Sequence, residues 1–599
     1  MNQNTLPKEA TPSADAQKPI GAEQLRELLR ILQAYKSGKA ATEQRIISSE
    51  NWWKLRNSAE EASETDLVKN GFTSRSGWLH NVIVSKHADA MDAYPEPKVL
   101  PREESDSAEA AMLSSIIPCV LEQNRFEETY DEAMWRKMKG GTAVYKIFWD
   151  KEKLNGLGDI SVECVSLLNL FWEPGLSDIQ KSRYFFHTEL CDREVLREQY
   201  PDLFENGVKS DSFMSSRFLY DDRVDTEEKA TVIEAYYHKY VEGKKTLQYV
   251  RFVGDTVLFA TENETEEQID ELGQTRPPMS VTGLYDHGMY PYVFDSLFPI
   301  EGSPCGYGYV DICRNPQTEI DMLKTCFIRN ARVGSVPRYF SRGDGTVNEE
   351  EFLNLENPIV HSVGGIDENA LRPIQHKPLD GSYLDLLRWD VNELRETSGN
   401  TETASGNLSN GVTAAAAIAA LQEASAKGSR DSTLSSYRAY ARMIELCIEL
   451  IRQFYHMPRK FRILGEYGKE NFVSYTNERI RPVHQGVIYG QDMGLRLPVF
   501  DIRISAQKKD AYSRVAQNEL AILLFEKGFF DPAVSDQALT CLALMSFDGK
   551  DVIMQTLAEN AVGVERHSAT DAAGVPRVKP DAAQTARMKT QNLVRAREV

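Results

Sequence analysis

The spacing of hydrophobic residues predicts an alternation of helices and strands over the first half of the chain. A first helix is marked by leucines at helical spacing: Leu25, Leu28, Leu29 and Leu32. Residues 108–139 are mostly helical, with a break or kink expected at Pro118. After Gly140 and Gly141, residues 142–149 are rich in β-branched and aromatic side chains, which predicts a strand. Further strands are expected at 159–165, 183–190, 231–240 and 247–260.

Two later segments carry narrow apolar stripes on otherwise polar helices. The first of these two striped helices is expected to start at Asn315 and Pro316, since asparagine caps helices and proline is tolerated at the first helical position. If an earlier turn is already helical, Pro316 kinks the helix instead. Its stripe consists of Ile320, Leu323 and Phe327, and the stripe of the second helix, residues 382–397, consists of Leu384, Leu387, Val391 and Leu394. Such stripes are typical of helices that pack against neighbours along a seam.

A polar loop and a long helix follow. Residues 398–411 are mainly glycine, serine, threonine and asparagine, and loops of this length are either functional or mere connections. The position between two long helices favours function. Residues 412–456 are predicted to be helical throughout, with a wide buried face over 434–455. Gly428 is either a harmless glycine or the point at which this helix bends. Strands at 460–475 and 498–505 and helices from 511 to about 557 complete the pattern.

Composition and charge limit the classes of function that are compatible with this chain. The 599 residues are 41% hydrophobic and 26% charged, as in ordinary globular proteins, and the net charge is −20. A general DNA-coating protein would be basic, so any contact with nucleic acid must be local or weak. Residues 1–20 are expected to be a disordered tail without a secretory signal, and 561–599 a flexible tail. We interpret the acidic run 261–272 as a solvated insertion. No segment is apolar enough to predict a membrane span.

Motifs that would indicate an enzyme are missing from the sequence. There is no Walker loop and no H-E-x-x-H, and Gly306 and Gly308 lack the third glycine of a dinucleotide fingerprint. The acidic residues after Phe340 and Arg342 mimic only half of a calcium loop, because these two side chains stand where ligands are needed. The eight cysteines form no C-x-x-C pair. We therefore expect no enzyme, no catalytic residues, no cofactor and no metal site; the competing alternative is an enzyme with an unrecognised polar pocket.

A local basic cluster stands out in this acidic chain. It lies at the end of the first striped helix and just beyond it, in a stretch without acidic residues: Lys324, Arg329, Arg332, Arg338 and Arg342. These cations either contact DNA or pair with acids of a neighbouring subunit, such as those at 349–351. The sequence leaves both alternatives open.

The order of elements from Gly306 to Tyr455 resembles that of bacteriophage portal proteins, which form the ring at the capsid vertex through which DNA passes. That family has a stem helix, a clip, a second stem helix, a tunnel loop and a long kinked wing helix. Residues 407–421 (NLSNGVTAAAAIAAL) are similar to the small-residue entry to the long helix. Residues 140–150 (GGTAVYKIFWD) resemble the wing strand of portals from short-tailed phages, and 504–514 (ISAQKKDAYSR) the turn into the crown.

The resemblance implies an α+β fold, with a mixed α/β wing, two stem helices, a small α/β clip, a long kinked wing helix and a short helical crown. The implied division is a tail (1–20), the wing (21–305), stem helix 1 (306–333), the clip (334–380), stem helix 2 (381–397), the tunnel loop (398–411), the wing helix with return strands (412–510), the crown (511–560) and a tail (561–599). The two stripes would form the stem seam, facing neighbouring subunits. The loop residues expected to line the DNA channel are Asn400, Thr401, Glu402, Thr403, Ser405, Asn407, Ser409 and Asn410.

The same resemblance implies a dodecameric ring in the virion, assembled in the host cytoplasm. Its implied partners are double-stranded DNA, the terminase large subunit, a head-completion or tail adaptor protein, and the major capsid and scaffolding proteins, with no membrane. The alternative reading is a non-catalytic scaffold or adaptor of another large assembly. A scaffold of extended coiled coils would sustain heptads over most of its length, whereas this chain mixes helices and strands.

Overall fold

The structure is a computed structural model in which two compact units are distinguished. The first contains Met1–Phe461 and Ser474–Lys508, and the second contains Arg462–Val473 and Lys509–Val599. The residues described are 19–55, 74–201, 203, 228–241, 243–269, 275–335, 338–341, 348–353, 361, 363, 371–374, 379–400, 427–464, 470–484, 487–488, 491–492, 495–506, 511–527, 541–542, 545 and 553.

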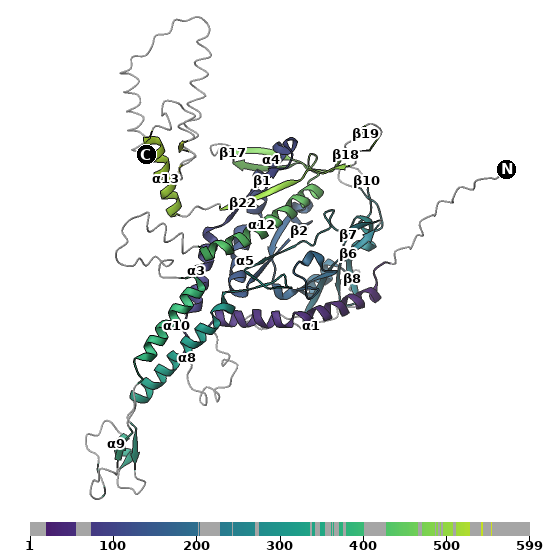
Figure 1. The fold of residues 1–599 in the computed structure, drawn as a ribbon. Coiled ribbons are helices and arrows are strands. Elements are labelled where there is room, and N and C mark those ends of the chain that lie inside the picture. The colour runs from purple at the N-terminus through teal and green to yellow at the C-terminus, as the bar shows by residue number, and fades with distance from the viewer. Residues whose placement is uncertain are drawn as a thin grey trace, which may run out of the picture. The chain divides into compact units, whose positions relative to one another are not determined.

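Helix α1 (Ala22–Trp53) covers one face of a five-stranded antiparallel sheet in the first unit (Figure 1). The strands, in spatial order, are β4 (Leu170–Trp172), β5 (Tyr184–Asp192), β6 (Lys229–Val241), β7 (Lys244–Val253) and β8 (Thr256–Ala260). Leu25, Leu28 and Leu32 pack against the aromatic and β-branched residues of the sheet, which confirms the predicted leucine stripe. The predicted strand 247–260 is two strands, because the chain reverses at Gly254, where φ is +56°.

A three-stranded antiparallel sheet forms a second layer of the first unit. Its order is β11 (Tyr292–Ser296), β2 (Thr142–Asp150) and β3 (Asp159–Cys164), and β2 and β3 confirm the strands predicted at 142–149 and 159–165. Three helices precede β2 in the sequence: α3 (Trp78–Asp92), α4 (Ser107–Gln123) and α5 (Phe126–Gly140). The predicted helix 108–139 does not break at Pro118. It breaks at Arg125, which adopts φ +50°, because α4 is held through the proline by a buried face of leucine, isoleucine and valine.

Helices α8 (Tyr309–Ser335) and α10 (Ser382–Ser398) lie side by side and antiparallel (Figure 1). Because α8 begins at Tyr309, Pro316 lies inside the helix, so the predicted start at Asn315 is wrong and the alternative of an earlier helical turn holds. Between the two helices, β14 (Tyr339–Ser341) pairs with β15 (Leu371–Pro373), and α9 (Glu349–Leu353) separates these strands in sequence. The connection thus contains both helix and strand.

Helix α12 (Lys427–Phe454) is the long buried helix predicted for the second half of the chain. It carries Met443, Ile444 and Ile451 at 0% exposure, which confirms the predicted buried face from Tyr440 to Tyr455, whereas Leu434, expected at the start of that face, is 48% exposed. The part of the prediction over 412–426 lies outside the described residues. Strand β1 (Pro95–Pro101) pairs with β22 (Phe500–Ala506), joining two segments about four hundred positions apart. Strands β16 (Arg459–Leu464) and β17 (Glu470–Tyr475) pair, and α13 (Ala511–Glu526) belongs to the second unit.

The remaining elements are short. They are α6 (Arg193–Gln199), α7 (Met279–Thr282), β9 (Gln268–Ile269), β10 (Thr275–Arg276), β12 (Phe298–Pro299), β13 (Gly306–Tyr307), β18 (Val483–His484), β19 (Val487–Ile488), β20 (Gln491–Asp492) and β21 (Leu495–Arg496). The start of the acidic run 261–272 is not a solvated insertion. Thr261 is fully buried, and Glu262 accepts hydrogen bonds from Tyr237 (2.6 Å) and Lys239 (2.7 Å), because the run begins at the edge of the sheet.

Two glycine motifs of the sequence pack against each other. Gly141 has φ +84°, and a Cβ there would lie 2.2 Å from the carbonyl carbon of Tyr307. A Cβ on Gly308 would lie 2.4 Å from the carbonyl oxygen of Lys139. Only glycine permits this approach of two backbones. The Gly306–Gly308 pair, which does not form a nucleotide loop, is therefore explained by packing where α8 begins.

Candidate functional site

The α8–α10 helix pair brings the two predicted apolar stripes together within one chain. Ile320 and Leu394 are only 1% exposed, so they belong to the core of the single chain and leave no surface for another copy. Leu323, Phe327, Leu387 and Val391 are half-buried, whereas Leu384 is 49% exposed. Much of the surface of these stripes is therefore already covered, because α8 packs against α10 and also against α3 and α5.

Besides Leu384, the pair carries exposed apolar residues that do not belong to the predicted stripes. On α10 they are Tyr383, Leu386 and Trp389, of which Trp389 is 70% exposed. On α8 they are Met322 (62% exposed) and Val333 (40% exposed). The α10 residues recur every three positions, so they share one helix face. We call these two sets the α10 patch and the α8 patch. Sequence reasoning missed them, although the three-residue spacing of aromatic and leucine side chains was a readable signal.

The basic cluster lies at the end of α8 that leads to β14. Arg329, Arg332 and Arg338 are exposed and Lys324 is half-buried, while Arg342 lies outside the described residues. Within the described part of the chain, no ion pair joins these four cations to an acid of the same subunit. The cluster is therefore available to a ligand or to another copy of the chain.

The predicted loop is described only at its start. Ser398 ends α10, and Asn400 is 7% exposed, with its backbone N–H bonded to the carbonyl oxygen of Arg395 at 3.0 Å. Asn400 therefore terminates the helix and offers little surface to DNA, contrary to its assignment as a channel residue. The other predicted channel residues lie outside the described part of the chain: Thr401, Glu402, Thr403, Ser405, Asn407, Ser409 and Asn410.

The start of α12 is held by a buried lysine that the sequence gave no reason to single out. Lys137 of α5 is 0% exposed and pairs with Asp295 of β11 at 2.6 Å. The same ammonium group donates to the hydroxyl of Ser436 at 2.7 Å and to the carbonyl oxygen of Ser432 at 3.3 Å. A buried charge is tolerated because it has a counter-ion and further hydrogen-bond acceptors. Gly428 is exposed near the start of α12, and its role as a bend point stays a prediction.

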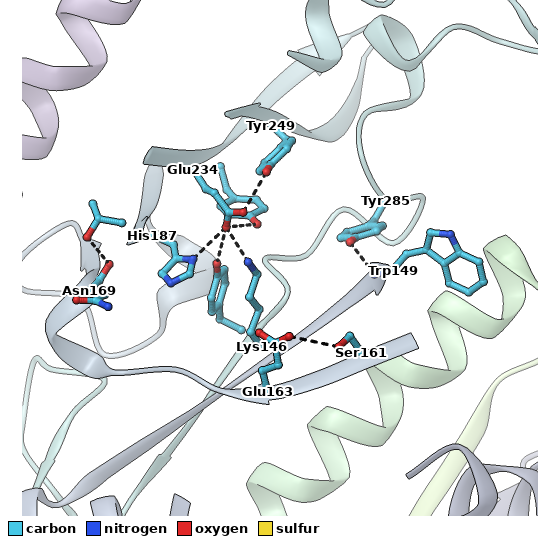
Figure 2. A network of polar contacts seen from close by, with 12 residues as sticks. Lys146, Trp149, Ser161, Glu163, Asn169, His187, Glu234, Tyr249 and Tyr285 are labelled. Atoms are coloured by element: carbon cyan, nitrogen blue, oxygen red, sulfur yellow. Dashed lines mark hydrogen bonds and ion pairs between the residues drawn. The ribbon is translucent and has the colours of Figure 1, made fainter. Parts of the chain in front are cut away.

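A second buried network converges on Glu234 of β6. Figure 2 shows Lys146, His187 and Tyr249 directed at this carboxylate. The distances to its oxygens are 2.8 Å from Lys146, 3.0 Å from His187 and 3.2 Å from Tyr249, and Tyr236 and Tyr292 also donate to it. Because Lys146 and Tyr292 come from the three-stranded sheet, the network ties the two sheets together.

The electrostatics of Glu234 favour a structural role. Burial alone would raise the pKa of the carboxyl, but the charge of Lys146 and the hydrogen bond with His187 outweigh it and hold this pKa well below its usual range. A general acid or base needs a pKa near the working pH and access to a substrate proton. A carboxylate held ionised by this many partners is instead a fixed counter-charge for Lys146.

The described residues contain no arrangement that suggests a resident metal. Among them, no group of three or more His, Cys, Asp or Glu side chains could hold an ion. The eight cysteines are free thiols. In the described part of the chain, no helix combines the length and apolar character needed to cross a bilayer.

The helix pair, its intervening helix-and-strand segment and the long buried helix follow one another along the chain in the order expected from the sequence. The comparison with protein families makes the assignment specific: the model of the phage P22-like portal protein family matches residues 89–283 and 291–597. The chain belongs to this family, which confirms the resemblance to phage portal proteins. Among curated proteins, no match is found.

Membership of the family carries several consequences. The protein is a structural, non-enzymatic component of a phage. Portal proteins assemble as oligomeric rings with other phage proteins, and the family implies a place at the capsid vertex of the virion. The mixed helices and strands described above fit such a subunit.

Proposed function

We propose that this chain forms a dodecameric ring whose central channel carries double-stranded DNA during packaging and ejection. In this proposal α8 and α10 are the stem helices, residues 334–380 form the clip, and α12 is the wing helix. Residues 21–305 belong to the wing and 511–560 to the crown. The ring is the platform for the terminase large subunit and the tail adaptor, and it contacts the capsid and scaffolding proteins during assembly in the host cytoplasm.

One observation carries the proposal of a ring built through the stem. The α10 patch and the α8 patch are apolar, exposed and located on different helices of one chain. Two different patches that bind each other head to tail produce a closed ring when the rotation between subunits closes. Aromatic residues such as Trp389 are enriched at the centres of protein interfaces. Contact between the α10 patch of one copy and the α8 patch of the next would bury both.

The charges of the chain suit a channel that does not retain DNA. The net charge of −20 per subunit repels a polyanion, which favours sliding over binding. The cations near the end of α8, among them Arg329 and Arg332, are exposed and either touch DNA phosphates or pair with a neighbouring subunit. Their placement next to the clip supports both of these roles equally.

We assign the loop 398–411 to the narrowest part of the channel. Glu402 is its only charged residue, and the remainder is mainly asparagine, threonine, serine and glycine. Such side chains exchange weak hydrogen bonds with phosphates without the affinity that lysine would add through counterion release. The loop would therefore follow a moving duplex.

Deleting Thr401–Asn407 tests this function. We expect rings and procapsids to assemble normally, because the α8–α10 pair and α12 lie outside the deletion. Packaged DNA per capsid should fall about tenfold or be lost after packaging, because the channel wall is shortened. A matched control replaces the same residues by a glycine-serine linker of equal length. Deletion capsids that fill and retain full-length genomes at the normal rate would show that the loop is only a connection.

A further inference from the structure

Backbone N–H groups at the N-terminus of α3 and just before it donate to side chains of α8. The first N–H groups of a helix lack partners within the helix. Here Gln317 of α8 accepts the N–H of Leu79 at 3.1 Å, and Asp321 accepts the N–H of Ser76 at 2.8 Å. Gln317 and Asp321 are buried, so these bonds are shielded from water. The position of α3 is thus set by the helix assigned above to the stem.

The C-terminal half of α3 holds two segments that are far apart in sequence. Lys86 donates to the hydroxyl of Ser429, at the start of α12, at 2.9 Å and to the carbonyl oxygen of Gly399, at the end of α10, at 3.4 Å. Asp89, one turn further along α3, accepts from the same Ser429 hydroxyl at 2.6 Å. Lys86 and Asp89 therefore bracket Ser429 from one helix.

The lysine at the centre of this arrangement is buried, whereas the Asp89 side chain is 45% exposed. The Lys86 side chain is 5% exposed and lies 3.7 Å from the Asp89 carboxylate. A buried lysine is retained where its three donors find acceptors and a counter-charge. Its charge also lies next to the C-terminus of α10, where the helix dipole favours a cation. The cavity beside Lys86, Asp89 and Ser429 measures only about 10 Å³, so the contacts are direct.

We propose that Lys86 is a positioning residue that holds both ends of the chain segment between Gly399 and Ser429, and that Asp89 supports it at the Ser429 end. That segment includes most of the loop assigned to the channel, so the inference rests on the proposed function. Because α3 is also fastened to α8 by Gln317 and Asp321, the stem, the base of the loop and the start of the wing helix are connected through one short helix. Residues 401–426 lie outside the described part of the chain, and the inference concerns only the groups that hold their two ends.

The first arm of the test measures amide hydrogen exchange in purified rings and needs no DNA. In Lys86→Met, peptides covering 396–400 and 427–433 should both exchange about tenfold faster, because one side chain holds both. Ser429→Ala should act mainly on the second peptide, and Ser429→Thr, which keeps the hydroxyl, should restore its protection. The matched control is Thr433→Ala, whose hydroxyl bonds only within α12, to the carbonyl oxygen of Ser429 at 2.9 Å.

The second arm measures DNA retained per capsid. Lys86→Met should lower it several-fold, with the thermal unfolding midpoint of the ring unchanged within a few degrees, whereas Thr433→Ala should match the wild type. Unchanged exchange at either end of the segment in Lys86→Met would overturn the inference, as would faster exchange with normal retention. A failure of the proposed function gives a different result. Capsids that carry the loop deletion would then package DNA normally, whatever hydrogen exchange shows in Lys86→Met.

Discussion

Replacing Trp389 by serine should abolish ring formation while the single chain stays folded. Trp389 is 70% exposed in the single chain, so its substitution removes little from the core. An aromatic side chain of this size buries about 150–250 Å² when covered, which is worth about 3 kcal/mol for each contact between subunits. Because a closed ring repeats the loss at every interface, the effect on assembly is large. Size-exclusion chromatography with light scattering measures it.

The matched control for Trp389→Ser is Arg388→Ser on the same helix. Arg388 is also exposed, as is its ion pair with Asp385, so its loss should change assembly little. Circular dichroism should be the same for both variants and the wild type. Rings of normal size and stability from Trp389→Ser would show that the α10 patch is not part of the contact between subunits.

Replacing Glu234 by glutamine should destabilise the first unit by about 3 kcal/mol at neutral pH. The substitution keeps the shape of the side chain but leaves the ammonium group of Lys146 buried without its counter-charge. The loss falls on the contact between the two sheets, which Glu234 joins. Urea unfolding at a fixed protein concentration, followed by tryptophan fluorescence, measures the difference.

The pH dependence of that difference follows from the pKa of Glu234. The pKa is lower in the folded than in the unfolded chain, so the charged carboxylate stabilises the fold above the unfolded pKa of about 4.3. This contribution is lost as the pH falls through the folded value. The difference between wild type and Glu234→Gln should be constant from pH 7 to about pH 5 and shrink below about pH 4.

The control for Glu234→Gln is Glu163→Gln, which lies nearby on β3. Glu163 is exposed, and its only contact drawn in Figure 2 is the hydrogen bond with Ser161 at 3.4 Å. Its substitution should change the free energy of unfolding by less than about 0.5 kcal/mol. An equal effect of the two substitutions, or one independent of pH down to pH 3, would refute the assignment of Glu234 as a buried counter-charge.

The helices and strands that were predicted correctly are those determined by residues close together in the sequence. The strand after Gly141 and the buried face of α12 follow from residue type and period alone, and both are present. The family could be recognised because the order of helices and strands is predictable even where their first and last residues are not. Of the two outcomes expected at Pro118, the break does not occur, because tertiary packing carries α4 through the proline, and the kink stays a prediction.

The features that sequence reasoning missed depend on contacts across long separations. Lys137 and Asp295 are 158 positions apart, and nothing in either local pattern indicates that they pair. Lys86 and Ser429 are 343 positions apart. The stripe residues Ile320 and Leu394 were assigned to a contact between subunits because periodicity shows that a residue is buried, without showing which surface covers it.

Native mass spectrometry of the purified full chain tests the central claim most directly. If the α8 and α10 patches join copies head to tail, the spectrum should contain a closed ring at twelve times the subunit mass of 67.7 kDa, accompanied at most by neighbouring ring sizes. A spectrum with only monomer or dimer at micromolar concentration would contradict the account.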